Sequence, residues 1–130
     1  MFSIAAENVR PTTVTANVAA DLAGKEGYVV EQIAGSEKVQ LYTNGIPYAV
    51  LGERIQGSDQ WNAYPINNGG RVPCIAGGAI NTPAYVKVAN GGKIVAADSL
   101  DNAIGVKRYP TAAAAANDVI AVDLGFVQAP

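Results

Sequence analysis

Short runs in which apolar and polar residues alternate are spread along most of the chain. Val86-Lys87-Val88 is one such run, and the residues from Ile120 to Leu124 form another. Alternation with a period of two is typical of a strand with one buried face, and Val, Ile and Tyr favour extended backbone. Asn, Asp and Gly separate the runs, as they do in turns. The pattern predicts eight strands, at residues 28–33, 38–42, 48–53, 71–75, 85–89, 93–97, 103–107 and 119–124.

The eight predicted strands form two similar sets of four, which cover residues 27–78 and 84–125. Tyr28 corresponds to Tyr85 and Gly52 to Gly105, so the offset shrinks from 57 to 53 residues. Such an offset indicates similar strands joined by turns of slightly different length. Two units are too few for a solenoid, which needs about three repeats or more. We therefore predict a single all-β domain at residues 21–130, with both four-strand units around one core as a small barrel or sandwich.

The first twenty residues lie outside this repeat. Pro11 and alternating valine and threonine favour an extended backbone, and large apolar side chains are few. We interpret residues 1–20 as an extended arm that adds a strand to the sheet edge of a partner, so that its removal would leave the domain stable. A frayed terminus is the alternative. The residues expected to form the added strand are Thr12, Thr13, Val14 and Thr15.

The composition argues against an enzyme. The chain has no histidine, which removes the commonest general base and the commonest metal ligand. No nucleophile, base and oxyanion-hole donors come together in the sequence. The one cysteine, Cys74, is expected to be a small buried apolar side chain, because no histidine is present to activate it. We predict no enzymatic activity, no cofactor and no metal.

Charge and hydropathy narrow the choice of partners. Nine basic residues are scattered among eleven acidic ones, so no basic patch for nucleic acid is expected. No apolar run approaches the ~20 residues of a membrane-spanning helix, and the N-terminal residues do not resemble a secretory signal. Charged residues make up 15% of the chain, below the ~25% of typical soluble domains. A surface this poor in charge favours a component of a larger assembly.

Two short segments carry candidate binding residues. Asp98 and Asp101 bring two carboxylates close together, but the further acidic ligands of a calcium loop are missing, and a hairpin turn explains the segment. Trp61 and Tyr64 lie in a predicted polar loop, where aromatic side chains can anchor an interface. The same pair could instead cap the mouth of a barrel, and both interpretations stay open.

The two units also carry a doubled motif. The first reads GYVV, EKVQLYTNGIPYAVLGE and GRVPCIAGG, and the second reads AYVKVANGGKIVAADSLDNAIGVKR and ANDVIAVDLG. Each has a Tyr-Val opening, a Gly-bearing turn, a strand that reaches a Gly and a closing alternating run. This pattern, from Lys25 to Gly125, resembles the capsid decoration (cement) proteins of tailed bacteriophages. The long segment around Trp61 departs from it.

The resemblance implies a small β-barrel or β-tulip that forms homotrimers at three-fold and quasi-three-fold positions of an expanded capsid. It implies an arm that binds the major capsid protein, a place on the outer surface of the virion after assembly in the host cytoplasm, and stabilisation against packaged DNA. A phage tail-associated or carbohydrate-binding β module that uses Trp61 and Tyr64 is an alternative of a different class. A hydrolase with an unusual site is a third candidate, which the absence of histidine argues against.

Overall fold

Ten short strands and one 3₁₀ turn make up the regular structure of residues 14–18, 22–55 and 60–130, which a computed structural model describes. All eight strands expected from the alternation are present, with bounds that differ by a few residues. In chain order the elements are β1 (Val14–Val18), β2 (Val29–Gln32), β3 (Lys38–Leu41), β4 (Pro47–Arg54), β5 (Gln60–Pro65), η1 (Ile66–Asn68), β6 (Arg71–Ile75), β7 (Ala84–Val88), β8 (Ile94–Ala96), β9 (Asn102–Tyr109) and β10 (Val119–Gln128).

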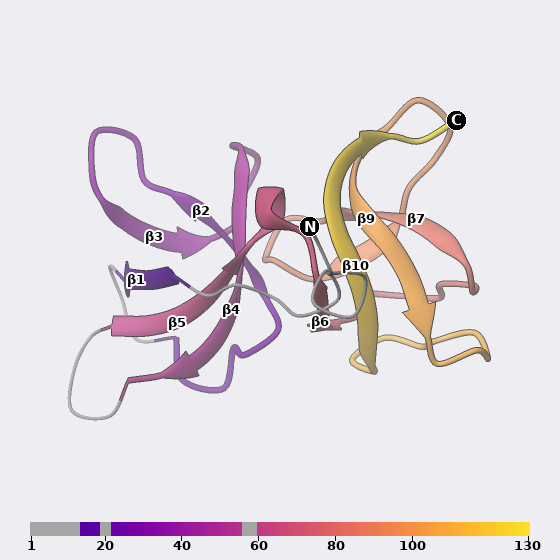
Figure 1. The fold of residues 1–130 in the computed structure, drawn as a ribbon, viewed down its shortest axis with the longest axis horizontal. Coiled ribbons are helices and arrows are strands. Elements are labelled where there is room, and N and C mark those ends of the chain that lie inside the picture. Colours follow the sequence, from indigo (N-terminus) through magenta and orange to yellow (C-terminus); the bar gives the residue numbers. More distant parts are fainter. Residues whose placement is uncertain (1–13, 19–21, 56–59) are drawn as a thin grey trace, which may run out of the picture.

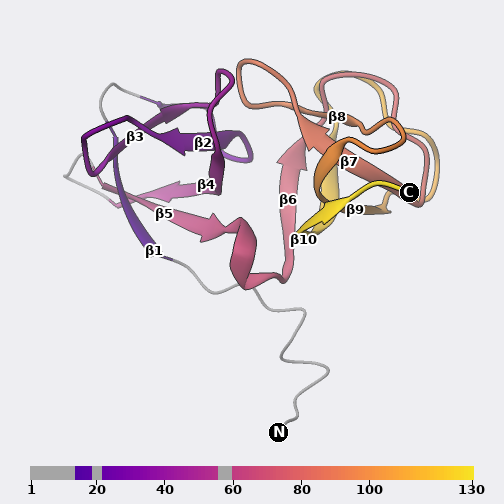
Figure 2. The ribbon, with the colours of Figure 1, turned by 90° about the horizontal axis from the view of Figure 1, so that it is seen from above.

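The strands form two sheets that lie side by side (Figures 1 and 2). The first has the order β1-β3-β2-β4-β5, and β1 closes it into a ring because it pairs parallel with β3 and antiparallel with β5. The second is an antiparallel sheet with the order β6-β10-β9-β7-β8. The predicted all-β class is confirmed, but the two units do not close together into one barrel.

β6 differs from the prediction in its partner rather than in its bounds. The sequence assigns residues 71–75 to the first unit, whereas β6 pairs with β10 in the second sheet. β5, in a segment that the sequence predicts as a loop, pairs with β4 in the first sheet. The physical reason is that alternation determines which face of a strand is buried but not which edge it pairs with.

β1 corrects the prediction of a free N-terminal arm. Its backbone pairs with β5, where Val14 lies opposite Ala63, and it also pairs with β3. Val14 and Thr15 therefore belong to a strand of the chain's own sheet, and the interpretation of residues 1–20 as one free arm is wrong for this strand. Without β1, the edges of β3 and β5 would be open, and unpaired strand edges are costly to leave exposed.

Two clusters of buried apolar side chains form the core of the protein. One lies inside the ring and includes Val30 and Leu51. The other combines the outer side of the ring, through Val29 and Val50, with the inner face of the second sheet, through Ile104 and others. Because Val29 and Val30 are consecutive, β2 is buried on both faces, and residues of both units share one core cluster. Across the described residues, no helix is long and apolar enough to cross a membrane.

Candidate functional site

The outer face of the β6–β10 pair gathers the side chains that alternation directs away from the core. Val72 and Cys74 point inward and are buried, as are Ile120 and Val122 on the partner strand. The residues between them face outward. Three cross-strand pairs of outward-facing residues follow one another along the two strands: Arg71–Asp123, Pro73–Ala121 and Ile75–Val119.

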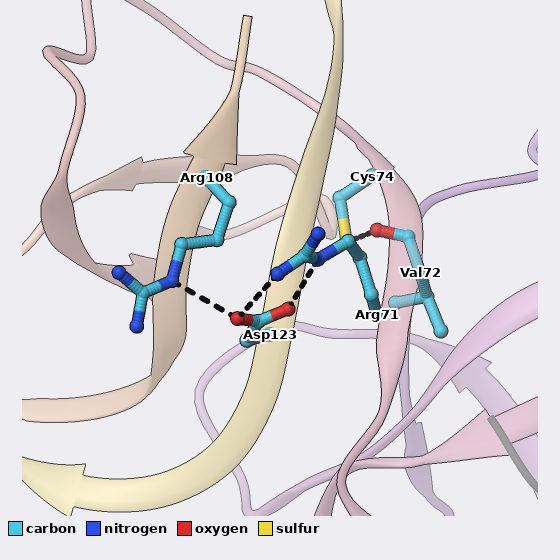
Figure 3. Close-up of polar contacts among 5 residues, drawn as sticks. All are labelled: Arg71, Val72, Cys74, Arg108 and Asp123. Atoms are coloured by element: carbon cyan, nitrogen blue, oxygen red, sulfur yellow. Dashed lines mark hydrogen bonds and ion pairs between the residues drawn. The ribbon is translucent and has the colours of Figure 1, made fainter. Parts of the chain in front are cut away.

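Asp123 is held between two arginines (Figure 3). Arg71 donates to its carboxylate through Nε at 2.7 Å and through a terminal nitrogen at 3.1 Å, and Arg108 donates through Nε at 2.9 Å. The hydrogen bond from Arg71 is the largest effect that lowers the pKa of Asp123, and the same bond raises the pKa of Arg71. Two cations share one anion here, so this end of the face carries an excess of positive charge.

A β-bulge explains why Arg108 reaches Asp123. Ala121 lies opposite Tyr109 while Val122 lies opposite Lys107, so Arg108 is an extra residue on β9. A bulge re-aims the side chains around it. Here it directs Arg108 and Tyr109 outward in succession, and the ring of Tyr109 lies 5.2 Å from the guanidinium carbon of Arg71.

Two adjoining hollows, which we call the outer groove, cross this face. One, of about 420 Å³, is lined by Arg71, Tyr109 and Pro110 among others. The other, of about 290 Å³, lies between the two sheets. They share Pro73 and Val119, and the exposed fraction of Val119 is 62%. The outer groove is thus a continuous surface with an apolar middle.

The second hollow ends at two carboxylates. Glu26 and Glu53 line it, together with Tyr64 and the backbone of Gly52. Both glutamates are exposed, and the three ion pairs found in the described ranges involve other side chains. The outer groove therefore has a basic end at Arg71, an apolar middle and an acidic end.

Trp61 and Tyr64 lie on opposite faces of a strand and not in a polar loop. The prediction of a loop here is wrong, because both residues lie on β5 and alternate between its faces. Trp61 is 2% exposed and packs inside the ring, so it neither anchors an interface nor caps a barrel mouth. Tyr64 faces the other way and lines the outer groove, so close to Gly52 that a Cβ there would lie 3.2 Å from its ring.

The other candidate residues are dispersed. Thr12 and Thr13 lie outside the described residues, and Val14 and Thr15 pair within β1. Cys74 is fully buried, as expected, and burial raises the pKa of its thiol to about 12. Its Sγ lies 4.0 Å from the carbonyl oxygen of Val72 (Figure 3).

The predicted turn at residues 98–102 is present just before β9. Asp101 accepts hydrogen bonds at 2.8 Å from the Lys87 ammonium and from the backbone N–H of Asp98. The bond from Lys87 is the main cause that lowers the pKa of Asp101. Within the part of the chain that the structure describes, no three or more acidic or cysteine side chains are grouped as metal ligands.

Two buried ionisable groups are not identified by the sequence pattern. Glu31 is 6% exposed and accepts hydrogen bonds from Gln40, Thr43 and Gly45. Lys107 is fully buried, although simple alternation with Ile104 and Val106 would direct it outward.

Lys107 holds two loops at the end of the second sheet. Its ammonium donates to the carbonyl oxygens of Ile80 and Ala112, each at 3.0 Å, and to the hydroxyl of Thr82. The bulge at Arg108 provides the reason for its burial, because the extra residue leaves Lys107 opposite the buried Val122.

Comparison with known proteins yields a structural neighbour but no sequence relative. No family model matches the chain. No curated protein sequence matches it either. Among solved structures, the chain is similar to the N base of the head fiber protein gp8.5 of bacteriophage phi29, with a TM-score of 0.63 and 18% identity. The match covers 88% of this chain and 93% of that one, and it shows that the two share a fold.

Proposed function

We propose that the chain is a structural protein of a bacteriophage virion that binds the outside of an expanded capsid and stabilises it, without enzymatic activity. The observation that carries this proposal is the shared fold with a head fiber base over 88% of the chain. The doubled motif from Lys25 to Gly125, which resembles capsid decoration proteins, supports it from the sequence alone.

The surface supports the same role. The chain contains 15% charged residues, and large apolar side chains such as Ile46, Phe126 and Val119 are more than half exposed. Exposed apolar side chains in a charge-poor surface favour burial against other proteins. We propose that the chain binds as a homotrimer at three-fold positions, because three copies held together bind a symmetric lattice more strongly than one copy does.

The carbohydrate-binding alternative loses its main residue in this fold. An aromatic side chain that stacks on a sugar must be accessible to it. The indole of Trp61 is instead enclosed by the strands of the first sheet. Tyr64 alone remains at the surface, in the outer groove. The fold therefore does not favour a glycan site at this pair.

Saturable binding to capsids tests the proposal. The purified chain is mixed with expanded capsids that lack decoration, from the phage that encodes it, and bound protein is measured after sedimentation. Saturation at a multiple of three copies per three-fold position, together with a higher temperature of capsid disruption, is expected. Unexpanded capsids are the matched control and should bind less. Absence of saturable binding to expanded capsids would contradict the proposal.

A further inference from the structure

We propose that the outer groove is the capsid-docking surface, and that it binds an extended segment of the major capsid protein with an acidic residue, an apolar residue and a basic residue in that spatial order. This inference rests on the proposed function and adds to it the face of the chain and the chemistry of the partner. Three features of the groove carry it: its charges, its floor and its edge.

The two ends of the groove carry opposite charges. At one end, Arg71 and Arg108 share the single carboxylate of Asp123, which leaves positive charge for an acidic partner group. At the other end, Glu26 and Glu53 line the groove and are available to a lysine or arginine. Complementary charges of this kind orient a partner and exclude wrong ones. The acidic end also repels phosphate groups, so the groove does not fit nucleic acid.

The floor between the charged ends is apolar and already exposed. Val119 and Pro73 belong to both hollows, and the exposed fractions of Val119 and Tyr109 are 62% and 53%. Tyr64 and Tyr109 stand in separate hollows on either side of this floor. Aromatic and aliphatic side chains that surround a concave surface are typical of the centre of an interface.

The neighbouring strand edge favours docking by side chains rather than strand addition. β6 is an edge strand of the second sheet. Pro73 stands in its middle and has no N–H to donate. Ile75 already donates its N–H to the carbonyl oxygen of Gly27. A partner segment therefore gains more from the groove than from the backbone of β6.

Two matched pairs of variants test the proposal in the capsid-binding assay. Val119→Asp introduces a charge into the apolar floor, and Leu100→Asp makes a comparable change at an exposed position of the turn before β9, outside the groove. We expect Val119→Asp to weaken capsid binding by about tenfold or more, which is about 1.4 kcal/mol, and Leu100→Asp to change it by less than about twofold. Thermal unfolding of both variants establishes that each is folded.

The second pair isolates the charges. The double variant Glu26→Gln/Glu53→Gln removes both carboxylates from the acidic end of the groove. The single variant Glu37→Gln removes an exposed carboxylate from the β2–β3 turn, outside the groove. We expect the double variant to bind about fivefold more weakly at low salt and to lose part of the salt dependence of binding. Glu37→Gln should match the unaltered chain in both respects.

The outcomes separate the two proposals. If the unaltered chain saturates capsids and Val119→Asp binds equally well, the groove is not the docking surface and the proposed function stands. If Val119→Asp instead dissociates the free protein into smaller species while its capsid binding is unchanged, the groove holds a second copy and the inference is overturned. If the unaltered chain fails to bind expanded capsids at all, both proposals are wrong.

Discussion

The carboxylate of Glu31 accepts a hydrogen bond at 2.9 Å from the backbone N–H of Thr43, twelve positions further along the chain. Gly45 donates its N–H to the same oxygen at 3.0 Å, and the hydroxyl of Thr43 donates to the other oxygen at 2.9 Å. Burial alone would raise the pKa of Glu31, but these bonds and one from Gln40 outweigh it and lower the pKa to about 2. The carboxylate thus holds the turn between β3 and β4 in place.

Replacement of Glu31 should weaken the fold and change how stability depends on pH. The pKa of Glu31 lies at about 2 in the folded state against 4.5 as a reference, a difference of about 3 kcal/mol. Because the folded-state pKa is the lower one, this stability is present above pH 4.5 and is lost as the pH falls from about 4.5 to about 2. We expect Glu31→Gln to lower the free energy of unfolding at neutral pH by about 2–3 kcal/mol.

Urea unfolding between pH 2 and 7 measures this effect. Glu37→Gln, in the same hairpin but exposed, is the control and should match the unaltered chain. Equal stability of Glu31→Gln and Glu37→Gln at neutral pH would show that the carboxylate does not hold the turn.

We expect Lys107 to stabilise the fold through the hydrogen bonds that its ammonium donates. Lys107→Met keeps the length of the side chain but removes all three hydrogen bonds, and buried acceptors that lose a donor cost about 1–3 kcal/mol. We expect a loss of about 2 kcal/mol of unfolding free energy, with faster hydrogen exchange in the segments around Thr82 and Ala112. Lys38→Met, at an exposed position of β3, should change neither quantity. Unaltered exchange around Thr82 in Lys107→Met would rule out the role of the ammonium.

Removal of β1 should destabilise the first sheet. A chain that begins at Asp21 lacks a strand that pairs on both sides and the buried Val18. Loss of one buried valine costs about 2 kcal/mol, which corresponds to a fall in Tm of roughly 8 °C for a domain of this size. The matched control begins at Thr13 and keeps β1. Equal Tm values for the two truncated chains would show that β1 adds nothing to stability, as expected of a free arm.

The strands could be predicted from the sequence because alternation and turn residues are local signals. β6 has the predicted bounds of 71–75, and the turn before β9 lies where Asp98 and Asp101 place it. β5 could in principle be recognised, since Trp61 and Ala63 alternate with Asn62 and Tyr64, but its polar residues and the preceding glycine favour a loop.

The rest depends on relationships between strands that are far apart in sequence. The pairing of β6 with β10 rather than with the first unit creates the outer face on which Arg71 meets Asp123. The bulge at Arg108 depends on the register of β9 against β10, in which Lys107 lies opposite the buried Val122. Alternation predicts which face of a strand is buried, but it does not identify the partner strand or the position of a bulge. The outer groove therefore could not be found before the fold was known.

Cys74 should react slowly with thiol reagents in the folded protein. Its side chain is fully buried, and burial raises its pKa to about 12, so the reactive thiolate is scarce at neutral pH. We expect modification by a disulfide reagent to follow the rate of unfolding and to accelerate in denaturant. Free cysteine in the same buffer provides the reference rate. Modification of the native protein at a rate near that of free cysteine would contradict the buried position.

Trp61 offers the most direct optical test of the fold, because it is the only tryptophan of the chain. Its side chain is 2% exposed inside the ring of strands, so we expect blue-shifted emission and little quenching by iodide in the native protein. Both should change to the values of an exposed indole in concentrated guanidinium chloride, which provides the control within the same sample. Trp61→Ala should cost about 3–5 kcal/mol through the cavity that it leaves, whereas Tyr64→Ala, in the outer groove, should cost less. Native emission like that of an exposed indole would show that Trp61 lies at the surface. The carbohydrate-binding alternative would then be open again.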